Sequence, residues 1–395
     1  MKGYIKGLDG VRAIAVILVM SFHYGITWFG WIGVQLFFVL SGFLITGILW
    51  KEKSRPEGLG FKLRKFWIRR SMRIFPLYFG YLLVLGITYL LFHFPTYYKL
   101  FIPYLVTYTF NYTRNLEGWV HNPLFTHLWS LSIEEQFYLL FPLFMFLCPP
   151  RLIRVVLLLV VLVTPVTRWL LGEYYSARGL APDVVADSVY WNTLSHLDAF
   201  CMGGAIPVLA LDQRIRKPQW LLTGSLFLLL GAGAWNFLHQ PYGHSYWNDL
   251  GYKMGEIAHD EHIWHYTCLN FFFSSFILVM ISVHSPAVFS RMRRLFEINW
   301  LVRIGKVSYG MYLFHWAIMV YFYKRFFPDG PVWKDILLFI PYVVLVYLLA
   351  ELSFRVYESR FLVWKEKLTA PKALSGEHKT GIAEGFPAVD GKSGL

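Results

Sequence analysis

The stretch "LDGVRAIAVILVMSFH", from Leu8 to His23, is apolar enough to form a membrane-spanning helix, yet it contains Asp9, Arg12 and His23. An ionisable side chain near the bilayer centre costs about 2.5–3.5 kcal/mol on insertion scales, so each one needs a partner, a cavity or a function. Arg12 and His23 are eleven residues apart, a spacing that returns both to nearly the same helix face after a rise of about 16 Å. The alternatives are an Arg12 that extends to the lipid headgroups and a His23 that bonds between helices.

The composition of the whole chain is that of a membrane protein. Of its 395 residues 56% are hydrophobic and only 15% are charged, with a mean hydropathy of +0.45. Apolar stretches of about 20 residues, each able to cross roughly 30 Å of hydrocarbon, recur along it. We predict an all-α, polytopic membrane protein of about ten transmembrane helices. The predicted spans are residues 9–28, 31–50, 74–94, 129–148, 152–172, 192–211, 219–238, 266–285, 305–326 and 335–358.

Basic residues predict the orientation of these spans. Residues 51–73 hold nine lysines and arginines, which places this loop in the cytoplasm. With ten spans, both termini are then cytoplasmic in a multi-pass protein of the cell membrane. The net charge of +13 follows from this bias, so no nucleic-acid partner is expected. We predict a transmembrane domain over residues 1–360 and a disordered cytoplasmic tail over 361–395.

Carboxylates occur in two further spans. In "HLWSLSIEEQFYLLFP", from His127 to Pro142, Glu134 and Glu135 lie at a depth close to that of His23 but point about 100° apart, so at most one of them faces the same cavity. A carboxylate near a histidine can fix its tautomer; the alternative is a buried ion pair with an arginine. Asp198, in "HLDAFCMGG", is either a polar packing residue or a site residue.

Three other segments contain candidate residues. Arg70 and Arg73, in "FWIRRSMRIFPLY", share a helix face and can bind phosphate groups or anchor the chain to anionic lipid. Tyr312 and His315, in "IGKVSYGMYLFHW", share a face and are either site residues or bonds between helices. The segment "HDEHIWH", residues 259–265, could ligate a metal if it were helical. We predict a solvated polar loop there and no metal site.

The order of these motifs resembles that of the membrane-bound acyltransferase-3 family. The resemblance runs over residues 8 to about 360. Its motifs are "LDGVRAIAVILVMSFH", "GVQLFFVLSGFLITGIL", "RRSMRIFPLY", "HLWSLSIEEQFYLLFP", "HLDAFCMGGAI" and "VSYGMYLFHW". It implies an O-acyltransferase that moves an acyl group, usually acetyl, from cytoplasmic acetyl-CoA to a hydroxyl of a glycan or another cell-envelope acceptor. Many relatives have Asp where this chain has Gln35, and some carry an extracytoplasmic esterase-like domain that we do not expect here.

The resemblance also assigns roles to individual residues. Carried over by position, His23 and Glu134 are catalytic, and Arg12, Arg70 and Arg73 bind the donor. We expect His23 to act as general base on the acceptor hydroxyl while Glu134 orients it, with acyl-CoA as a donor substrate and no tightly bound cofactor. Two alternatives are a proton-coupled transporter or flippase of a glycan or lipid-linked precursor, in which His23 and Glu134 relay protons, and a non-catalytic scaffold. The acceptor and the acyl chain length stay open.

Overall fold

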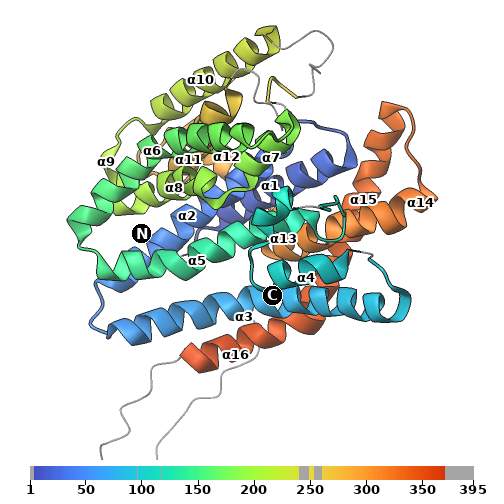
Figure 1. Cartoon of the computed structure of the whole chain (residues 1–395). Helices are drawn as coiled ribbons and strands as arrows, with labels where there is room; N and C mark the ends of the chain where they lie inside the picture. Colours follow the sequence, from blue (N-terminus) through green and yellow to red (C-terminus); the bar gives the residue numbers. More distant parts are fainter. Residues whose placement is uncertain (1–3, 96, 117, 240–248, 253–259, 370–395) are drawn as a thin grey trace, which may run out of the picture.

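The computed structural model describes residues 4–95, 97–116, 118–239, 249–252 and 260–369, which form helices and loops without a strand. A helix lies at each of the ten predicted spans (Figure 1). These helices are α1 (Lys6–Tyr24), α2 (Ile32–Lys53), α3 (Leu59–Phe92), α5 (Trp129–Leu147), α6 (Pro150–Ala177), α8 (Leu197–Val208), α10 (Pro218–His239), α11 (Glu261–Ile281), α13 (Asn299–Ile318) and α15 (Val332–Ser353).

Shorter elements connect or extend these helices. The α-helices among them are α4 (Tyr98–Val106), α7 (Pro182–Trp191), α9 (Leu211–Arg214), α12 (Ala287–Phe296), α14 (Lys324–Phe326) and α16 (Ser359–Thr369). Three 3₁₀ turns cover Phe110–Asn115, Thr126–Leu128 and Thr193–His196. Two π-helical segments cover Met319–Tyr323 and Phe354–Glu358.

Within the described residues, eight helical segments are long and apolar enough to cross a membrane. The predicted all-α, polytopic membrane fold is therefore confirmed. The two predicted spans outside these eight are α8 and α13. Helix α8 has only 12 residues, about 18 Å of rise, and nearly all of them are buried, so it is a core helix that other helices shield from lipid. Helix α13 includes the charged residues Arg303 and Lys306.

Glycines set the close contacts at the centre of the bundle. A Cβ atom on Gly42 of α2 would overlap the carbonyl of Phe200 on α8, and one on Gly203 would overlap the carbonyl of Val39. Similarly, a Cβ atom on Gly305 of α13 would overlap the carbonyl of Asp9 on α1. These absent side chains let the backbones approach, which is how small residues drive helix packing in membranes. The contact of α1 with α13 brings the polar faces of both helices together.

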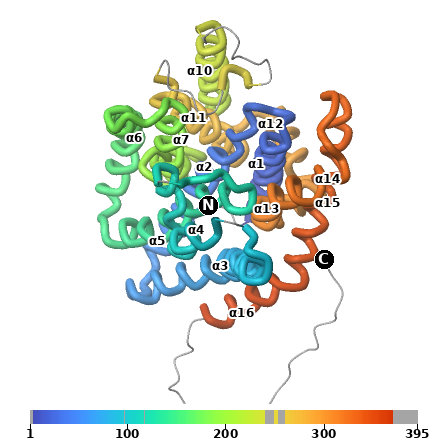
Figure 2. Tube along the Cα trace, turned by 45° about the vertical axis from the view of Figure 1, so that its right-hand side comes forward, coloured from blue at the N-terminus to red at the C-terminus, as the bar shows by residue number. Residues whose placement is uncertain are grey.

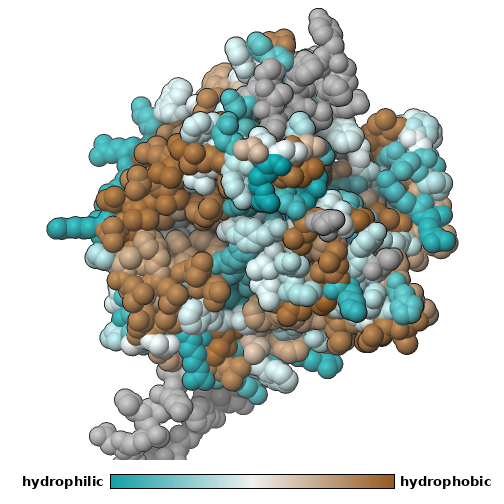
Figure 3. Space-filling model, viewed as in Figure 1, coloured by the Kyte–Doolittle hydropathy of each residue, from teal (hydrophilic) through white to brown (hydrophobic). Residues whose placement is uncertain are grey.

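The outer helices carry the lipid-facing surface. Helices α6 and α10 expose large apolar side chains such as Leu162 and Phe227, and hydrophobic residues gather over the α5 and α6 side of the molecule in Figure 3. In Figures 1 and 2, α10 lies at one edge of the bundle, and α3 and α16 lie side by side at the opposite edge.

Two sequence predictions need correction. The tail predicted as disordered from residue 361 begins inside α16, where Arg69 Nε of α3 donates to Thr369 Oγ1 at 3.1 Å; residues 370–395 lie outside the described residues. The loop predicted at 259–265 is helical from Glu261, and His262 and His265 are buried. Glu261, His262, His265 and Tyr266 lie on the buried face of α11, so these polar residues belong to a packed helix rather than to a solvated loop. His259 lies outside the described residues.

Candidate functional site

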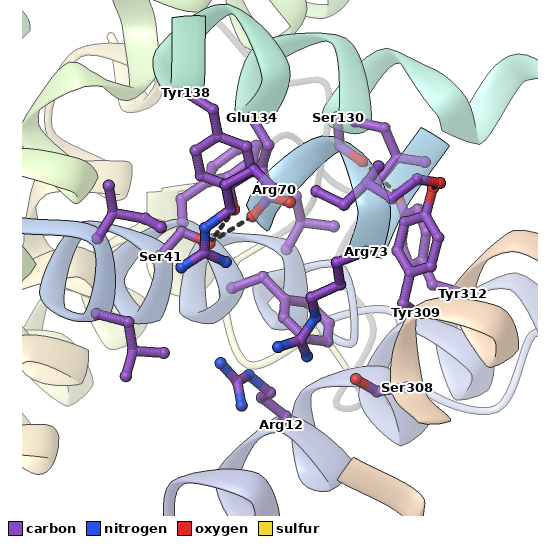
Figure 4. Close-up of a pocket in the computed structure, with 17 residues that line it drawn as sticks. Arg12, Ser41, Arg70, Arg73, Ser130, Glu134, Tyr138, Ser308, Tyr309 and Tyr312 are labelled. Atoms are coloured by element: carbon purple, nitrogen blue, oxygen red, sulfur yellow. Dashed lines mark hydrogen bonds between the residues drawn. The ribbon is translucent and has the colours of Figure 1, made fainter. Parts of the chain in front are cut away.

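A polar cavity lies among five helices that are far apart in sequence. Its volume is about 100 Å³, and its polar lining comes from α1, α2, α3, α5 and α13 (Figure 4). These polar residues are Arg12, Ser41, Arg70, Arg73, Ser130, Glu134, Tyr138, Ser308, Tyr309 and Tyr312. Polar groups that converge in a membrane interior mark a functional site by default. We call this space the inner cavity.

Glu134 lies in the inner cavity, where it is bound by a neighbouring helix. Ser41 Oγ of α2 donates to Glu134 Oε1 at 2.6 Å and lies 3.0 Å from Tyr138 Oη. The guanidinium of Arg70 lies 5.5 Å from the centre of the Tyr138 ring, an arrangement that favours the cation. The adjacent Glu135 is not among the residues that line the cavity.

The three predicted arginines line the inner cavity but differ in their partners. Arg12 Nη1 forms an ion pair with Asp9 Oδ1 at 2.5 Å, and Asp9 also accepts a hydrogen bond from Tyr4. Asp9 is therefore the counter-ion of Arg12. Within the described part of the chain, no carboxylate lies within ion-pair distance of Arg70 or Arg73. These two arginines can bind an anion, and a guanidinium does so through two parallel hydrogen bonds.

The partner of His23 is a second histidine. His23 is not among the residues that line the inner cavity, and its Nδ1 lies 2.9 Å from Nε2 of His315 on α13. The Trp316 ring packs on the His23 ring at 3.9 Å between centroids, and the His127 ring lies 5.2 Å from the His315 ring. The structure thus brings His23 and His315 together, whereas the predicted partner Glu134 is bound to Ser41.

The hydrogen bonds of this pair determine where the protons lie. His315 Nδ1 is 2.6 Å from the carbonyl of Tyr312; a carbonyl only accepts, so this Nδ1 carries the proton. With both rings neutral, His315 Nε2 accepts the proton of His23 Nδ1. The lone pair of His23 is then on Nε2, where it can take a proton from a hydroxyl. His315 therefore does what a carboxylate does beside a catalytic histidine: it fixes the tautomer.

Tyr312 forms the wall between the inner cavity and the histidines. Its side chain lines the cavity, while its hydroxyl donates to the carbonyl of His127 at 3.0 Å and lies 2.6 Å from Ser130 Oγ. Its own carbonyl binds His315. The candidate site therefore has two parts, an arginine-lined inner cavity and a histidine cluster, which share the residue Tyr312.

Comparisons with known proteins identify the family of the chain. A family model described as "Acyltransferase domain" matches residues 5–353. The O-acetyltransferase OatA of Staphylococcus aureus strain NCTC 8325 / PS 47 is 30% identical over 378 residues, which are 90% of this chain and 57% of OatA. A "Putative O-acetyltransferase" of S. aureus strain COL is 29% identical over 379 residues, 91% of this chain and 57% of that relative. The chain thus spans little more than half the length of these relatives. No solved structure shows a significant match.

Asp198, a candidate site residue, lies apart from both parts of the site. It forms an ion pair with Arg168 of α6 and accepts from Thr267 Oγ1 at 2.7 Å and Asn270 Nδ2 at 3.1 Å. Both members of the ion pair are fully buried. The sequence prediction missed Arg168, although an arginine in the apolar span 152–172 was a signal that a partner must exist. No comparable reason selects Ser41, Tyr138 or Trp316 from the sequence, because uncharged side chains are common in membrane helices.

We predict that Asp198→Ala destabilises the protein, because it leaves the Arg168 charge buried and unpaired. Breaking a buried pair costs about 3–5 kcal/mol. Thermal unfolding in detergent measures the loss, with Asp183→Ala as the control, since that carboxylate is 76% exposed. The double variant Arg168→Met/Asp198→Leu should recover much of the stability. An Asp198→Ala protein of normal stability would contradict this structural role.

Proposed function

The chain belongs to the acyltransferase-3 family, and from this premise we propose that it is a membrane O-acyltransferase. It transfers an acyl group, most simply acetyl, from cytoplasmic acyl-CoA to a hydroxyl of a glycan or another cell-envelope acceptor. The observation that carries the proposal is the histidine pair: His23 Nε2 is a base whose tautomer is fixed by His315. The names of the relatives, O-acetyltransferases, support the acetyl group.

The arginines of the inner cavity receive the donor in this proposal. Arg70 and Arg73 bind the CoA diphosphate, because they are cationic and lack a carboxylate partner among the described residues. The basic loop 51–73 makes their end of the bundle the cytoplasmic one. Both described ends of the chain then lie on that side of the cell membrane. The pantetheine arm extends from the arginines past Tyr312 toward His23.

In the transfer reaction, the acceptor hydroxyl loses its proton, and a C–O bond replaces the C–S bond of the thioester. His23 Nε2 accepts the proton of the acceptor hydroxyl as its oxygen attacks the thioester carbonyl carbon. The C–S bond then breaks, and the leaving CoA thiolate takes the proton from His23 Nε2, which restores the neutral base. The His23 imidazolium keeps its Nδ1 hydrogen bond to His315, and the Trp316 ring face stabilises its charge. General base catalysis of this kind contributes about 10²–10⁴-fold.

We propose a role for Glu134 in the donor site rather than beside His23. Because it accepts from Ser41 and lies with Arg70 and Arg73 in the inner cavity, it sets the charge and shape of the donor site. His315 takes over the orienting role beside His23.

We predict that His23→Ala abolishes transfer of radiolabelled acetyl from acetyl-CoA into material that mild hydroxylamine releases. The loss should be about 10²–10⁴-fold, because the general base is missing. Host membranes with the wild-type chain, His23→Ala, or neither are compared after the protein amounts are matched. Equal label in both variants above empty membranes would refute the role of His23. Acceptor movement without CoA release would identify a transporter.

We predict that His315→Ala lowers kcat about tenfold or more and leaves the KM for acetyl-CoA nearly unchanged. The reason is that the variant removes the side-chain partner that orients the His23 ring, while the donor cavity keeps all its lining residues. His284→Ala is the matched control, since His284 is exposed and its Nε2 lies 2.9 Å from the Gln213 carbonyl. His315→Gln, whose amide can accept from His23, should restore part of kcat. A KM effect without a kcat effect would contradict this positioning role.

We predict that Arg73→Ala raises the KM for acetyl-CoA about tenfold, because a charge-assisted phosphate contact is lost. Arg73→Lys should recover only part of the affinity, since lysine cannot bind bidentately. Arg64→Ala is the control: it lies on the same helix, is exposed and does not line the cavity. An unchanged donor dependence in Arg73→Ala would make Arg73 a membrane anchor.

A further inference from the structure

A second cavity adjoins the inner cavity on its cytoplasmic side. It has a volume of about 320 Å³ and is lined by α2, α3, the end of α5 and α16. Arg70 and Arg73 line both cavities, so a single extended ligand can occupy both. We call this second space the outer cavity.

The outer cavity is strongly cationic. Its charged lining consists of one carboxylate, Glu52, and eight cations, which are Lys51, Arg55, Lys62, Lys65, Arg69, Arg70, Arg73 and Lys365. Glu52 forms ion pairs at 3.1 Å with both Arg55 and Lys65. Among the described residues, no carboxylate lies within ion-pair distance of Lys51, and Lys365 has only the exposed Glu366, at 3.2 Å. Exposed pairs of this kind are weak, so the cavity keeps a large excess of positive charge.

Helix α16 closes this cavity although it lies beyond the residues that the family model matches. Arg69 holds it against α3 through Thr369 Oγ1 at 3.1 Å and Glu366 Oε2 at 3.5 Å, and Lys365 projects into the lining. Figure 1 shows α16 lying along α3. Two aromatic residues, Phe66 and Phe146, complete the wall and offer flat apolar surfaces to a base.

We infer that the outer cavity binds the phosphorylated nucleotide of the acyl-CoA donor, with Lys51 and Lys365 on its 3′-phosphate. This inference rests on the proposed function. The order of groups along CoA supports it: the diphosphate lies nearer the thioester than the 3′-phosphate does. The diphosphate therefore falls at Arg70 and Arg73, where the two cavities meet, and the 3′-phosphate falls at Lys51 and Lys365, which line the outer cavity and not the inner one.

Binding of two thioether analogues to the purified full chain tests this inference. One is the stable analogue of acetyl-CoA, and the other lacks only the 3′-phosphate. For the wild type we expect the dephospho analogue to bind about tenfold more weakly, since a charge-assisted contact is missing. In Lys51→Ala/Lys365→Ala the complete analogue should bind about as weakly as the dephospho one. Lys367→Ala, an exposed lysine of α16 outside the cavity lining, is the control and should keep the wild-type preference.

The outcomes separate this inference from the proposed function. Equal affinity of the wild type for both analogues overturns the nucleotide site, and an unchanged preference in the double variant overturns its assignment to these lysines. If Lys51 and Lys365 bind lipid headgroups instead, the double variant should retain less anionic phosphatidylglycerol than the wild type and yet keep the wild-type preference for the complete analogue, which also overturns the inference. Acetyl transfer by the wild type is measured separately: binding preference without transfer would refute only the enzymatic function.

Discussion

The cost of an unpaired charge in hydrocarbon organises this molecule. Fully buried Arg168 is matched by Asp198, Arg12 by Asp9, and Arg303 Nε donates to Glu351 at 2.7 Å. Each pair either links two helices or neutralises the charge on one helix face. Removing either partner would leave a charge that the bilayer cannot solvate. Against this background, an arginine without a carboxylate is informative, since only an open cavity or a bound anion can stabilise it.

Arg70 and Arg73 are stabilised by the cavities that they line rather than by an ion pair with a carboxylate. Arg73 is solvent-accessible although it lies among the helices, as expected for a residue that borders two cavities. The histidine cluster lies on the other side of Tyr312, whose hydroxyl is held by Ser130 and the His127 carbonyl. The cationic groups and the histidines therefore lie in different compartments. In the proposed function, one extended donor reaches from the first compartment to the second, and this links the two parts of the site.

Sequence patterns predicted the helices and the inner cavity better than the pairing of side chains. Long apolar runs fix helix positions, and the spacing of Arg70 and Arg73 places both on one face of α3, so these predictions needed no tertiary information. The partner of His23 depends instead on how α1 meets α13, a contact set by Gly305 against the Asp9 carbonyl. No periodicity within one helix shows such a contact. The charge of Arg168, by contrast, required a partner that could have been sought among the intramembrane carboxylates.

A histidine suits the position beside His23 better than a carboxylate does, for an electrostatic reason. A carboxylate there would bring a permanent charge among His127, His315 and Trp316, where a buried ion is costly. A neutral imidazole fixes the same tautomer by hydrogen bonding and adds no charge to the resting site. In the proposed mechanism, positive charge appears only while His23 holds the acceptor proton, and the Trp316 face at 3.9 Å stabilises it at that moment. In that mechanism the favourable interaction is strongest in the transition state, which is the condition for it to accelerate transfer.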